Sequence, residues 1–239
     1  MRRIGLLGGT SWESTAHYYA QLNQGVAQRL GGFHSADLLL RSVDFAEVEA
    51  LQRAGDWAAL GERYAGEAAT LRDAGAQVIG ILANTMHLVH DDVVRASGLP
   101  VPHVVDAVAQ AATRAGVHRL ALLGTRYTME STLYPDRLRA QGLTTLTPSG
   151  DDAVETNRII YSELVHGVVR DTSRVALQGI VDRLVAAGAD AVVLGCTELA
   201  MILGADDLPV PVLDSTALHV HALLHAALEP QALPERGAA

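Results

Sequence analysis

LRDAGAQVIGILA at residues 71–83 and LVAAGADAVVLGC at residues 184–196 follow one pattern, with the second copy shifted by 113 positions. In each copy an amphipathic stretch passes through a glycine turn into a short apolar run, which is typical of a buried parallel strand. A second pair precedes these, because LLGGTSWEST at 6–15 returns as LLGTRYTMEST at 122–132. Matching segments in the same order predict an internal duplication, with two related lobes of about 110 residues each.

Short apolar runs alternate with amphipathic stretches along the chain, which favours an α/β fold with parallel sheets. The predicted strands are Ile4–Leu7, Leu38–Val43, Val78–Leu82, His103–Val105, Leu120–Leu123, Ala191–Leu194 and Pro211–Leu213. The predicted helices between them include Ser14–Arg29, Trp57–Ala74, Met129–Gln141 and Thr172–Ala187. We therefore expect two pseudo-symmetric Rossmann-like lobes, each a mostly parallel sheet flanked by helices, with the active site in the cleft between them.

The tetrapeptide LPVP marks where the chain passes between the lobes. It occurs at 99–102 and 208–211, each time before a predicted strand that ends in aspartate, Asp106 or Asp214. The expected first lobe comprises residues 1–100 plus about 210–228, because the last strand and helix can return to it. The expected second lobe comprises residues 101–209. Residues 229–239 are expected to form a disordered tail.

Composition narrows the class of protein. The chain has 239 residues, of which 49% are hydrophobic, enough for one large core or two small ones. A net charge of −9 argues against nucleic acid or an anionic membrane as the main partner. No apolar run is long enough for a membrane span, and the apolar stretch near the start is too short for a signal peptide. The single cysteine cannot form an internal disulfide, so we expect a cytoplasmic protein.

Four predicted strands end in small or hydroxyl residues that lead towards a helix. These ends are Gly8-Gly9-Thr10-Ser11, Ala83-Asn84-Thr85, Gly124-Thr125 and Gly195-Cys196-Thr197-Glu198. Ligands bind beyond the carboxyl ends of parallel strands, and such turns aim N–H groups and hydroxyls at an anion. Facing lobes would bring the four ends together and predict a site for a small dicarboxylate, built without Lys or Arg. The alternative for any single turn is an ordinary helix cap.

Cys196 is the candidate catalytic residue. A lone cysteine is more often a small buried hydrophobe than a catalyst. Here, however, it lies at a strand end and at a predicted helix N-terminus, a setting that lowers the thiol pKa and exposes the sulfur. The shift of 113 positions places Ala83 opposite Cys196 across the cleft.

Competing sites are weaker. Gly8-Gly9 is not a dinucleotide fingerprint, and no P-loop is present. A metal would need a third ligand beside His87, His90, Asp91 and Asp92, or beside His221 and His225, so we expect no metal. A cysteine nucleophile with His87 or His103 as its base stays open.

These motifs resemble the aspartate/glutamate racemase superfamily. The matching segments are LLGGTSWEST at 6–15, ANTMH at 83–87, LLGTRYTM at 122–129 and GCTEL at 195–199. HSADLLLRSVDF at 34–45 is most similar to the bacterial amino-acid racemase branch that takes aspartate or glutamate.

The resemblance implies a homodimeric enzyme that needs no pyridoxal phosphate or other cofactor and acts on an amino dicarboxylate. In the family, two cysteines flank the α-carbon, one removing a proton and the other returning one to the opposite face. By the same resemblance, Asn84, Thr85, Thr125 and Thr197 match positions that hold carboxylates or polarise the developing enolate, and Thr10 and Gln52 match substrate-contacting positions.

Ala83 departs from this pattern, because alanine cannot carry a proton at the second-base position. Three explanations stay open: an introduced substitution, a natural one-base enzyme, or a member of a single-thiol branch that contains decarboxylases and cis–trans isomerases. ANTMH and SWEST favour the racemase.

Overall fold

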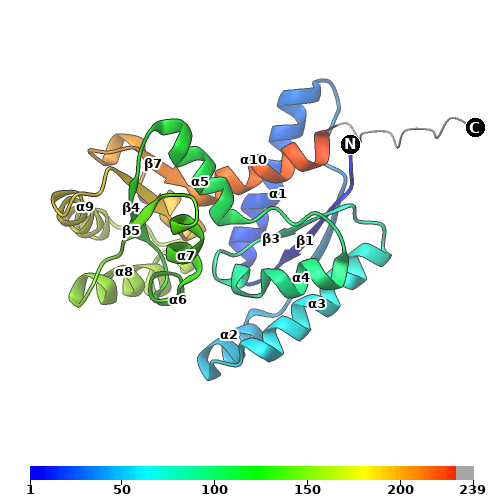
Figure 1. The fold of residues 1–239 in the computed structure, drawn as a ribbon, viewed down its shortest axis with the longest axis horizontal. Helices are drawn as coiled ribbons and strands as arrows, with labels where there is room; N and C mark the ends of the chain where they lie inside the picture. Colours follow the sequence, from blue (N-terminus) through cyan, green and yellow to red (C-terminus); the bar gives the residue numbers. More distant parts are fainter. Residues whose placement is uncertain (230–239) are drawn as a thin grey trace, which may run out of the picture.

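The computed structural model describes residues 1–229 and contains two lobes side by side, each built on a parallel sheet (Figure 1). The first sheet has the strand order β2-β1-β3 and the second the order β5-β4-β6-β7. The strands are β1 (Ile4–Gly8), β2 (Leu38–Ser42), β3 (Val78–Ile81), β4 (Arg119–Leu123), β5 (Thr144–Leu146), β6 (Ala191–Leu194) and β7 (Val212–Asp214). The predicted α/β class with two parallel-sheet lobes is confirmed. The predicted tail lies, from residue 230 on, outside the described residues.

Helices cover both faces of the sheets (Figure 1). They are α1 (Trp12–Leu30), α2 (Phe45–Ala54), α3 (Trp57–Asp73), α4 (His90–Ser97), α5 (Val104–Ala115), α6 (Arg126–Glu130), α7 (Leu133–Arg139), α8 (Asp151–Ser162), α9 (Asp171–Ala186) and α10 (Ser215–Leu228). Short 3₁₀ turns join them at η1 (Thr85–Val89), η2 (Leu164–His166), η3 (Thr197–Met201) and η4 (Ala205–Asp207). Among residues 1–229, no helix combines the length and apolarity needed to cross a membrane.

Alternate residues of each strand enter separate cores on the two faces of the sheet. In β1, Ile4 and Leu6 pack with Tyr18 of α1 and Leu223 of α10, whereas Leu7 faces the helices on the opposite side. Burial on both faces explains why these strands are continuous apolar runs rather than alternating ones. Each fully buried Leu or Ile contributes about 1.5–3 kcal/mol to folding, so the cores hold the strand ends in place.

The two lobes repeat one another in their hydrogen bonding. The Ile79 N–H on β3 donates to the Pro100 carbonyl, and the Val192 N–H on β6 donates to the Pro211 carbonyl, both at 2.9 Å. Ile79 and Val192 are the residues that the shift of 113 equates, and each carbonyl belongs to an LPVP segment. Both LPVP segments therefore run beside the last repeated strand of their lobe.

The predicted strand His103–Val105 is wrong, because this segment begins helix α5. His103 is the N-cap residue, and its imidazole Nδ1 accepts a hydrogen bond from the Val105 N–H at 3.1 Å. Val104, Val108 and Ala112 are buried at helical spacing, and a short apolar run does not distinguish a helix from a strand. Asp106 consequently lies in the first turn of α5, where Arg137 binds both of its oxygens.

The expected return of the last strand to the first lobe is also wrong. β7 pairs in parallel with β6 in the second sheet. Helix α10 then runs from β7 towards the first lobe (Figure 1) and contacts α1 and β3 as well as α5. Leu223 and Leu224 of α10 belong to the core that covers β1, so α10 ties the two lobes together.

The predicted helix Met129–Gln141 is divided into α6 and α7. Ser131 between them has an extended backbone, with φ −79° and ψ 162°. In a continuous helix, the ring of Pro135 would clash with the Ser131 carbonyl. Pro135 also has no backbone N–H to donate to that carbonyl. With the break, Pro135 lies in the first turn of α7, where proline is tolerated.

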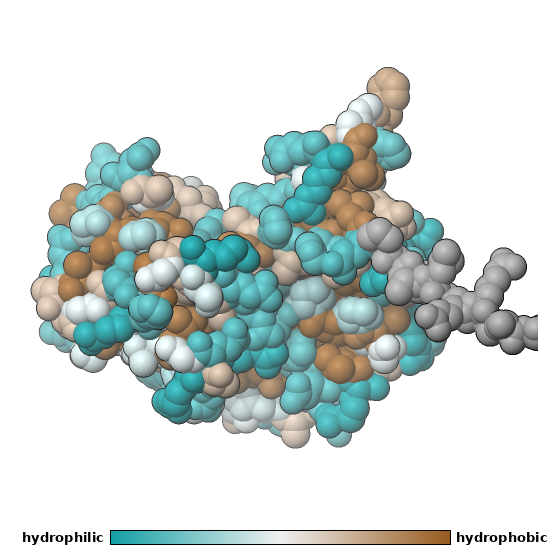
Figure 2. All heavy atoms as spheres, turned by 45° about the horizontal axis from the view of Figure 1, so that its top comes forward, coloured by the Kyte–Doolittle hydropathy of each residue, from teal (hydrophilic) through white to brown (hydrophobic). Residues whose placement is uncertain are grey.

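The end of α1 and the turn after it project from the body of the molecule (Figures 1 and 2). Phe33 in this turn is fully exposed, and Leu30 at the end of the helix is 46% exposed.

Candidate active site

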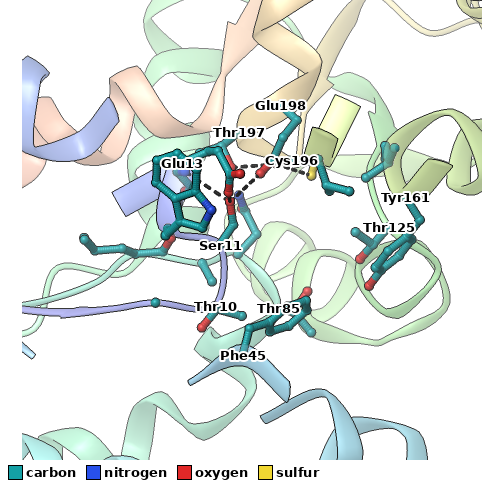
Figure 3. Close-up of a pocket in the computed structure, with 18 of the residues that line it drawn as sticks. Thr10, Ser11, Glu13, Phe45, Thr85, Thr125, Tyr161, Cys196, Thr197 and Glu198 are labelled. Carbon is teal, nitrogen blue, oxygen red and sulfur yellow. Dashed lines mark hydrogen bonds between the residues drawn. The ribbon is translucent and has the colours of Figure 1, made fainter. Parts of the chain in front are cut away.

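A cavity of about 660 Å³ lies between the lobes, at the carboxyl ends of β1, β3, β4 and β6. Its volume falls in the range of small-molecule sites. The catalytic and substrate-binding positions that the family resemblance implied all line it: Thr10, Gln52, Ala83, Asn84, Thr85, Thr125, Cys196 and Thr197. Figure 3 shows side chains from both lobes facing this cavity, with Cys196 and Glu198 on one side and Thr10, Phe45 and Thr85 on another.

The turn after β1 depends on a glycine. Gly9 has φ +95°, and a Cβ atom there would lie 2.2 Å from the Val43 carbonyl oxygen, so only glycine fits. The turn delivers Ser11, whose hydroxyl caps α1 by accepting from the Ser14 N–H at 3.1 Å. Thr125 caps α6 in the same way. The other two predicted helix starts, at 84–85 and 196–197, are 3₁₀ turns without a side-chain cap.

Cys196 lies in extended backbone just before η3 and is partly exposed. Its Sγ donates to Glu198 Oε2 at 2.9 Å. Burial, followed by the negative charge of Glu198, raises the thiol pKa well above its ordinary value. The expected lowering of this pKa is therefore wrong, because a single 3₁₀ turn gives little dipole and a carboxylate contacts the sulfur. The raised pKa favours the protonated thiol, which is the proton-donating form.

Glu198 is the functional candidate that the sequence reasoning missed. It is only 5% exposed, and its carboxylate accepts three bonds from the site. Besides the thiol, the Ser11 hydroxyl donates to Oε1 at 2.9 Å and the Thr197 hydroxyl to Oε2 at 2.8 Å. Ser11 comes from the first lobe, so its bond to Glu198 links the two lobes beside the cavity. The sequence had placed Glu198 in the strand end that carries Cys196, but had given it no role.

Ala83 lines the cavity with a methyl group. Its backbone carbonyl is bound by His87. The His87 Nδ1 donates to the Ala83 carbonyl at 3.1 Å, an arrangement that requires the proton on Nδ1. His87 Nε2 is buried and has no partner among the described residues. Neither His87 nor His103 lines the cavity, so neither is placed to act as a base for Cys196.

A chain of threonine hydroxyls crosses between the lobes. Thr128 Oγ1 lies 3.2 Å from Thr85 Oγ1 and 3.2 Å from Thr125 Oγ1. Thr128 is 1% exposed and was not predicted as a site residue. Tyr161 also lines the cavity and was missed; burial, and then the neighbouring Cys196, raise its pKa to about 12, so its hydroxyl stays protonated.

Asn84 is fixed in place rather than free to rotate. Its Oδ1 accepts from the buried Tyr134 hydroxyl at 2.6 Å, and its Nδ2 donates to the Ser215 hydroxyl at 3.0 Å. Tyr134 lies on α7, between β4 and β5 of the second lobe, and Ser215 directly follows β7, so this amide is another link between the lobes. One N–H of Nδ2 is left for a ligand.

Thr10 and Gln52 occupy the first-lobe side of the cavity. The Thr10 hydroxyl lies 2.7 Å from the Tyr64 hydroxyl. Gln52 is 4% exposed, and its amide nitrogen donates to the Met86 sulfur at 3.3 Å, a weak acceptor. Both side chains can therefore contribute polar groups to a ligand.

The described lining contains no Arg or Lys, whereas Glu13, Asp44 and Glu198 are acidic. The donors for a bound carboxylate are therefore backbone N–H groups, hydroxyls and side-chain amides at the strand ends. Across residues 1–229, no group of three or more His, Cys, Asp or Glu side chains has an arrangement suited to a metal ion.

Comparisons with known proteins agree with this architecture. Residues 7–223 match the family model described as Asp/Glu/Hydantoin racemase. The structure of a protein assigned as an Asp/Glu racemase from Yersinia pestis is 45% identical, with a TM-score of 0.90 over 96% of this chain and 100% of that one. An aspartate racemase homologue from Pyrococcus horikoshii is 34% identical, with a TM-score of 0.85 over the same shares.

A curated relative adds a shorter match. An uncharacterised protein from the pnlA 3′ region of Pectobacterium carotovorum subsp. carotovorum is 32% identical over 100 residues, which span 42% of this chain and 65% of that protein. The family match, by contrast, extends over both lobes and all four strand ends that line the cavity. The chain therefore belongs to the Asp/Glu/Hydantoin racemase family.

Proposed function

We propose that this protein is a cofactor-independent amino-acid racemase of the aspartate/glutamate type, in which Cys196 exchanges a proton with the α-carbon of the substrate. The observation that carries the proposal is the Cys196 thiol, hydrogen-bonded to Glu198 and lining a cavity whose opposite lobe presents Ala83. The membership of the family supports proton transfer next to a carboxylate.

The proposed chemistry uses the strand ends as an anion cradle. The α-carboxylate is held by Asn84, Thr85, Thr125 and Thr197, and Thr10 and Gln52 contact the rest of the substrate. Removing the α-proton pushes charge onto the carboxylate oxygens, where a fixed hydroxyl or N–H donor contributes about 2.7–4 kcal/mol to transition-state stability. Cys196 removes the α-proton as a thiolate, after its own proton has passed to Glu198, and returns a proton to the same face as a thiol.

Ala83 gives this reaction its expected stereochemistry. On the face opposite Cys196 the chain supplies a methyl group and no acid or base. Return of the proton by Cys196 regenerates the starting enantiomer, so exchange with solvent is expected to be faster than inversion. Inversion then needs water at the Ala83 face, which makes it slow.

Deuterium exchange tests the proposal. Each enantiomer of aspartate and glutamate is incubated with the protein in D₂O, and loss of the α-proton signal is followed by NMR. We expect exchange with at least one of them and its loss in Cys196→Ser, while Glu130→Gln, an exposed change on α6, exchanges normally. Absence of exchange with all four compounds would overturn the proposal.

One observation favours a second candidate, a single-thiol decarboxylase or cis–trans isomerase. A neutral thiol without an opposing base suits a reaction in which the other face loses CO₂ and one proton is donated. Release of CO₂ from a substituted malonate, or conversion of maleate, without amino-acid exchange would select it. Binding of a dicarboxylate in a calorimeter without any turnover would instead indicate a binding protein.

We further propose a homodimer located in the cytoplasm. The exposed Phe33 and Leu30 on the projecting end of α1 support an apolar contact with a second copy. Sedimentation of the wild type and of Phe33→Ser tests the assembly, with dissociation of the dimer expected in the variant and an unchanged monomer in both contradicting it.

A further inference from the structure

We propose that Glu198, Ser11 and Glu13 form a proton relay between the Cys196 thiol and solvent, with Glu198 as the residue that positions and reloads the thiol. The inference rests on the proposed function, because a relay is needed only if Cys196 exchanges a proton with a substrate. The sequence predicted no role in proton transfer for Glu198, Ser11 or Glu13.

The relay is a continuous series of contacts. Cys196 Sγ lies 2.9 Å from Glu198 Oε2, Glu198 Oε1 lies 2.9 Å from Ser11 Oγ, and Ser11 Oγ lies 3.3 Å from Glu13 Oε2. Figure 3 shows this line of side chains along one side of the cavity. Glu198 is buried, whereas Ser11 and Glu13 are partly exposed, so the series leads from the interior to the surface.

The Cys196 thiol needs such a path because of Ala83. When the thiol gives its proton to an α-carbanion, it becomes a thiolate, and the first lobe offers no group to replace the proton. A solvent proton taken up by Glu13 passes to Ser11 Oγ as the Ser11 proton moves to Glu198 Oε1. A half-turn of the Glu198 carboxyl then presents that proton to Sγ. One proton moves inward in total, and every group returns to its starting form. Proton abstraction from the substrate runs the series in reverse.

The relay also depends on the relative position of the lobes. Ser11 and Glu13 belong to the first lobe, whereas Glu198 and Cys196 belong to the second. The Ser11–Glu198 bond is therefore made only when the lobes are together. Reloading of the thiol is confined to this arrangement.

Titration of the thiol separates the relay from a structural role of Glu198. The rate of Cys196 alkylation by iodoacetamide is measured against pH in the wild type and in Glu198→Gln, which keeps the size of the side chain but removes its charge. Loss of a negative charge beside sulfur favours the thiolate, so the alkylation midpoint should fall by about one pH unit. The same variant should exchange the substrate α-proton about tenfold more slowly or worse. A merely structural role would not give these opposite changes.

The outer members of the relay have a different expected signature. Ser11 and Glu13 do not contact the sulfur, so Ser11→Ala and Glu13→Gln should keep the alkylation midpoint of the wild type. Both variants should nevertheless slow deuterium exchange. Ser11→Thr, which keeps a hydroxyl, should exchange normally. Glu130→Gln controls for loss of a carboxylate elsewhere in the second lobe.

Two results would overturn the relay: an unchanged or raised alkylation midpoint in Glu198→Gln, or wild-type exchange in Ser11→Ala. The alkylation measurement needs no substrate, so it tests Glu198 even if the proposed reaction fails. Circular dichroism of each variant identifies any that does not fold. If Glu198→Gln fails to fold, the titration is repeated with Glu198→Asp, which retains the charge. The alkylation midpoint of Glu198→Asp should stay within the wild-type range.

Discussion

In the proposed reaction, position 83 decides whether a second proton-transfer group faces the substrate. Ala83 keeps the backbone bond to His87 and the turn into η1, and it presents a methyl group to the cavity. The duplication paired Ala83 with Cys196 through the shift of 113 positions, and both residues line the cavity. It did not predict the state of the thiol. That state depends on Glu198, whose other partner, Ser11, lies 187 positions away in the chain.

Tyr134 carries a prediction at the residue scale. Its hydroxyl is the buried donor to Asn84 Oδ1 at 2.6 Å. Tyr134→Phe leaves that oxygen without this partner, which should lower the free energy of unfolding by about 1–3 kcal/mol. Because the Asn84 amide is then free to turn, substrate exchange should also fall. Urea denaturation and the exchange assay measure both; wild-type values in each would show that this bond does not hold Asn84.

At the scale of elements, apolar runs and their turns were sufficient to locate the strands that position the site. All predicted strands except 103–105 are observed to within two residues of their predicted ends. The failure at 103–105 came from the His103 imidazole, an uncommon helix cap that a composition pattern does not reveal. The break between α6 and α7 follows from Pro135, which the amphipathic pattern of 129–141 concealed. Pairing of β7 with β6 is a long-range choice that local patterns do not encode.

The turn after β1 provides a prediction at this scale. Gly9→Ala forces an alanine into a positive φ and places its Cβ against the Val43 backbone. The turn must move, so Thr10 and Ser11 should leave their positions and activity should be lost. Gly55→Ala is the matched control, since Gly55 also has positive φ but no atom within 4 Å of the added Cβ. Gly55→Ala should lower the free energy of unfolding by only about 1–2 kcal/mol. Equal thermal shifts in the two variants would contradict this reading of the turn.

At the scale of the whole molecule, four histidines surround the segment where the chain first leaves the first lobe. Between ring centroids, His87 lies 4.8 Å from His103 and 5.2 Å from His219. The centroid of the His90 ring lies 4.7 Å from that of His103. The His219 Nε2 donates to the Pro102 carbonyl and the His90 Nε2 to the Val101 carbonyl. The cluster thus fixes the LPVP linker and, through α10, the relative position of the lobes.

We expect this cluster to make the fold sensitive to acid. Burial lowers the pKa of His219 to about 4 and that of His103 to about 2, and also lowers that of His87. Below pH 6.5 the unfolded chain binds protons that the folded chain does not, so stability falls as pH falls. Each such histidine contributes up to about 1.4 kcal/mol per pH unit until its folded pKa is reached.

Urea unfolding between pH 7 and pH 5 measures this effect. We expect a steep loss of stability in the wild type and a shallower slope in His219→Gln, with the exposed His34→Gln as control. A stability that is flat over this range would show that the buried histidines take up protons without unfolding.

The most direct test of the single-thiol account compares deuterium exchange with inversion at the substrate α-carbon. Both rates are measured on one sample in D₂O, by NMR and by chiral chromatography, for the wild type and for Ala83→Cys. We expect wild-type exchange to exceed inversion by about tenfold or more, and a second thiol at position 83 to raise inversion until the two rates are similar. Equal rates of exchange and inversion in the wild type, unchanged by Ala83→Cys, would contradict the account.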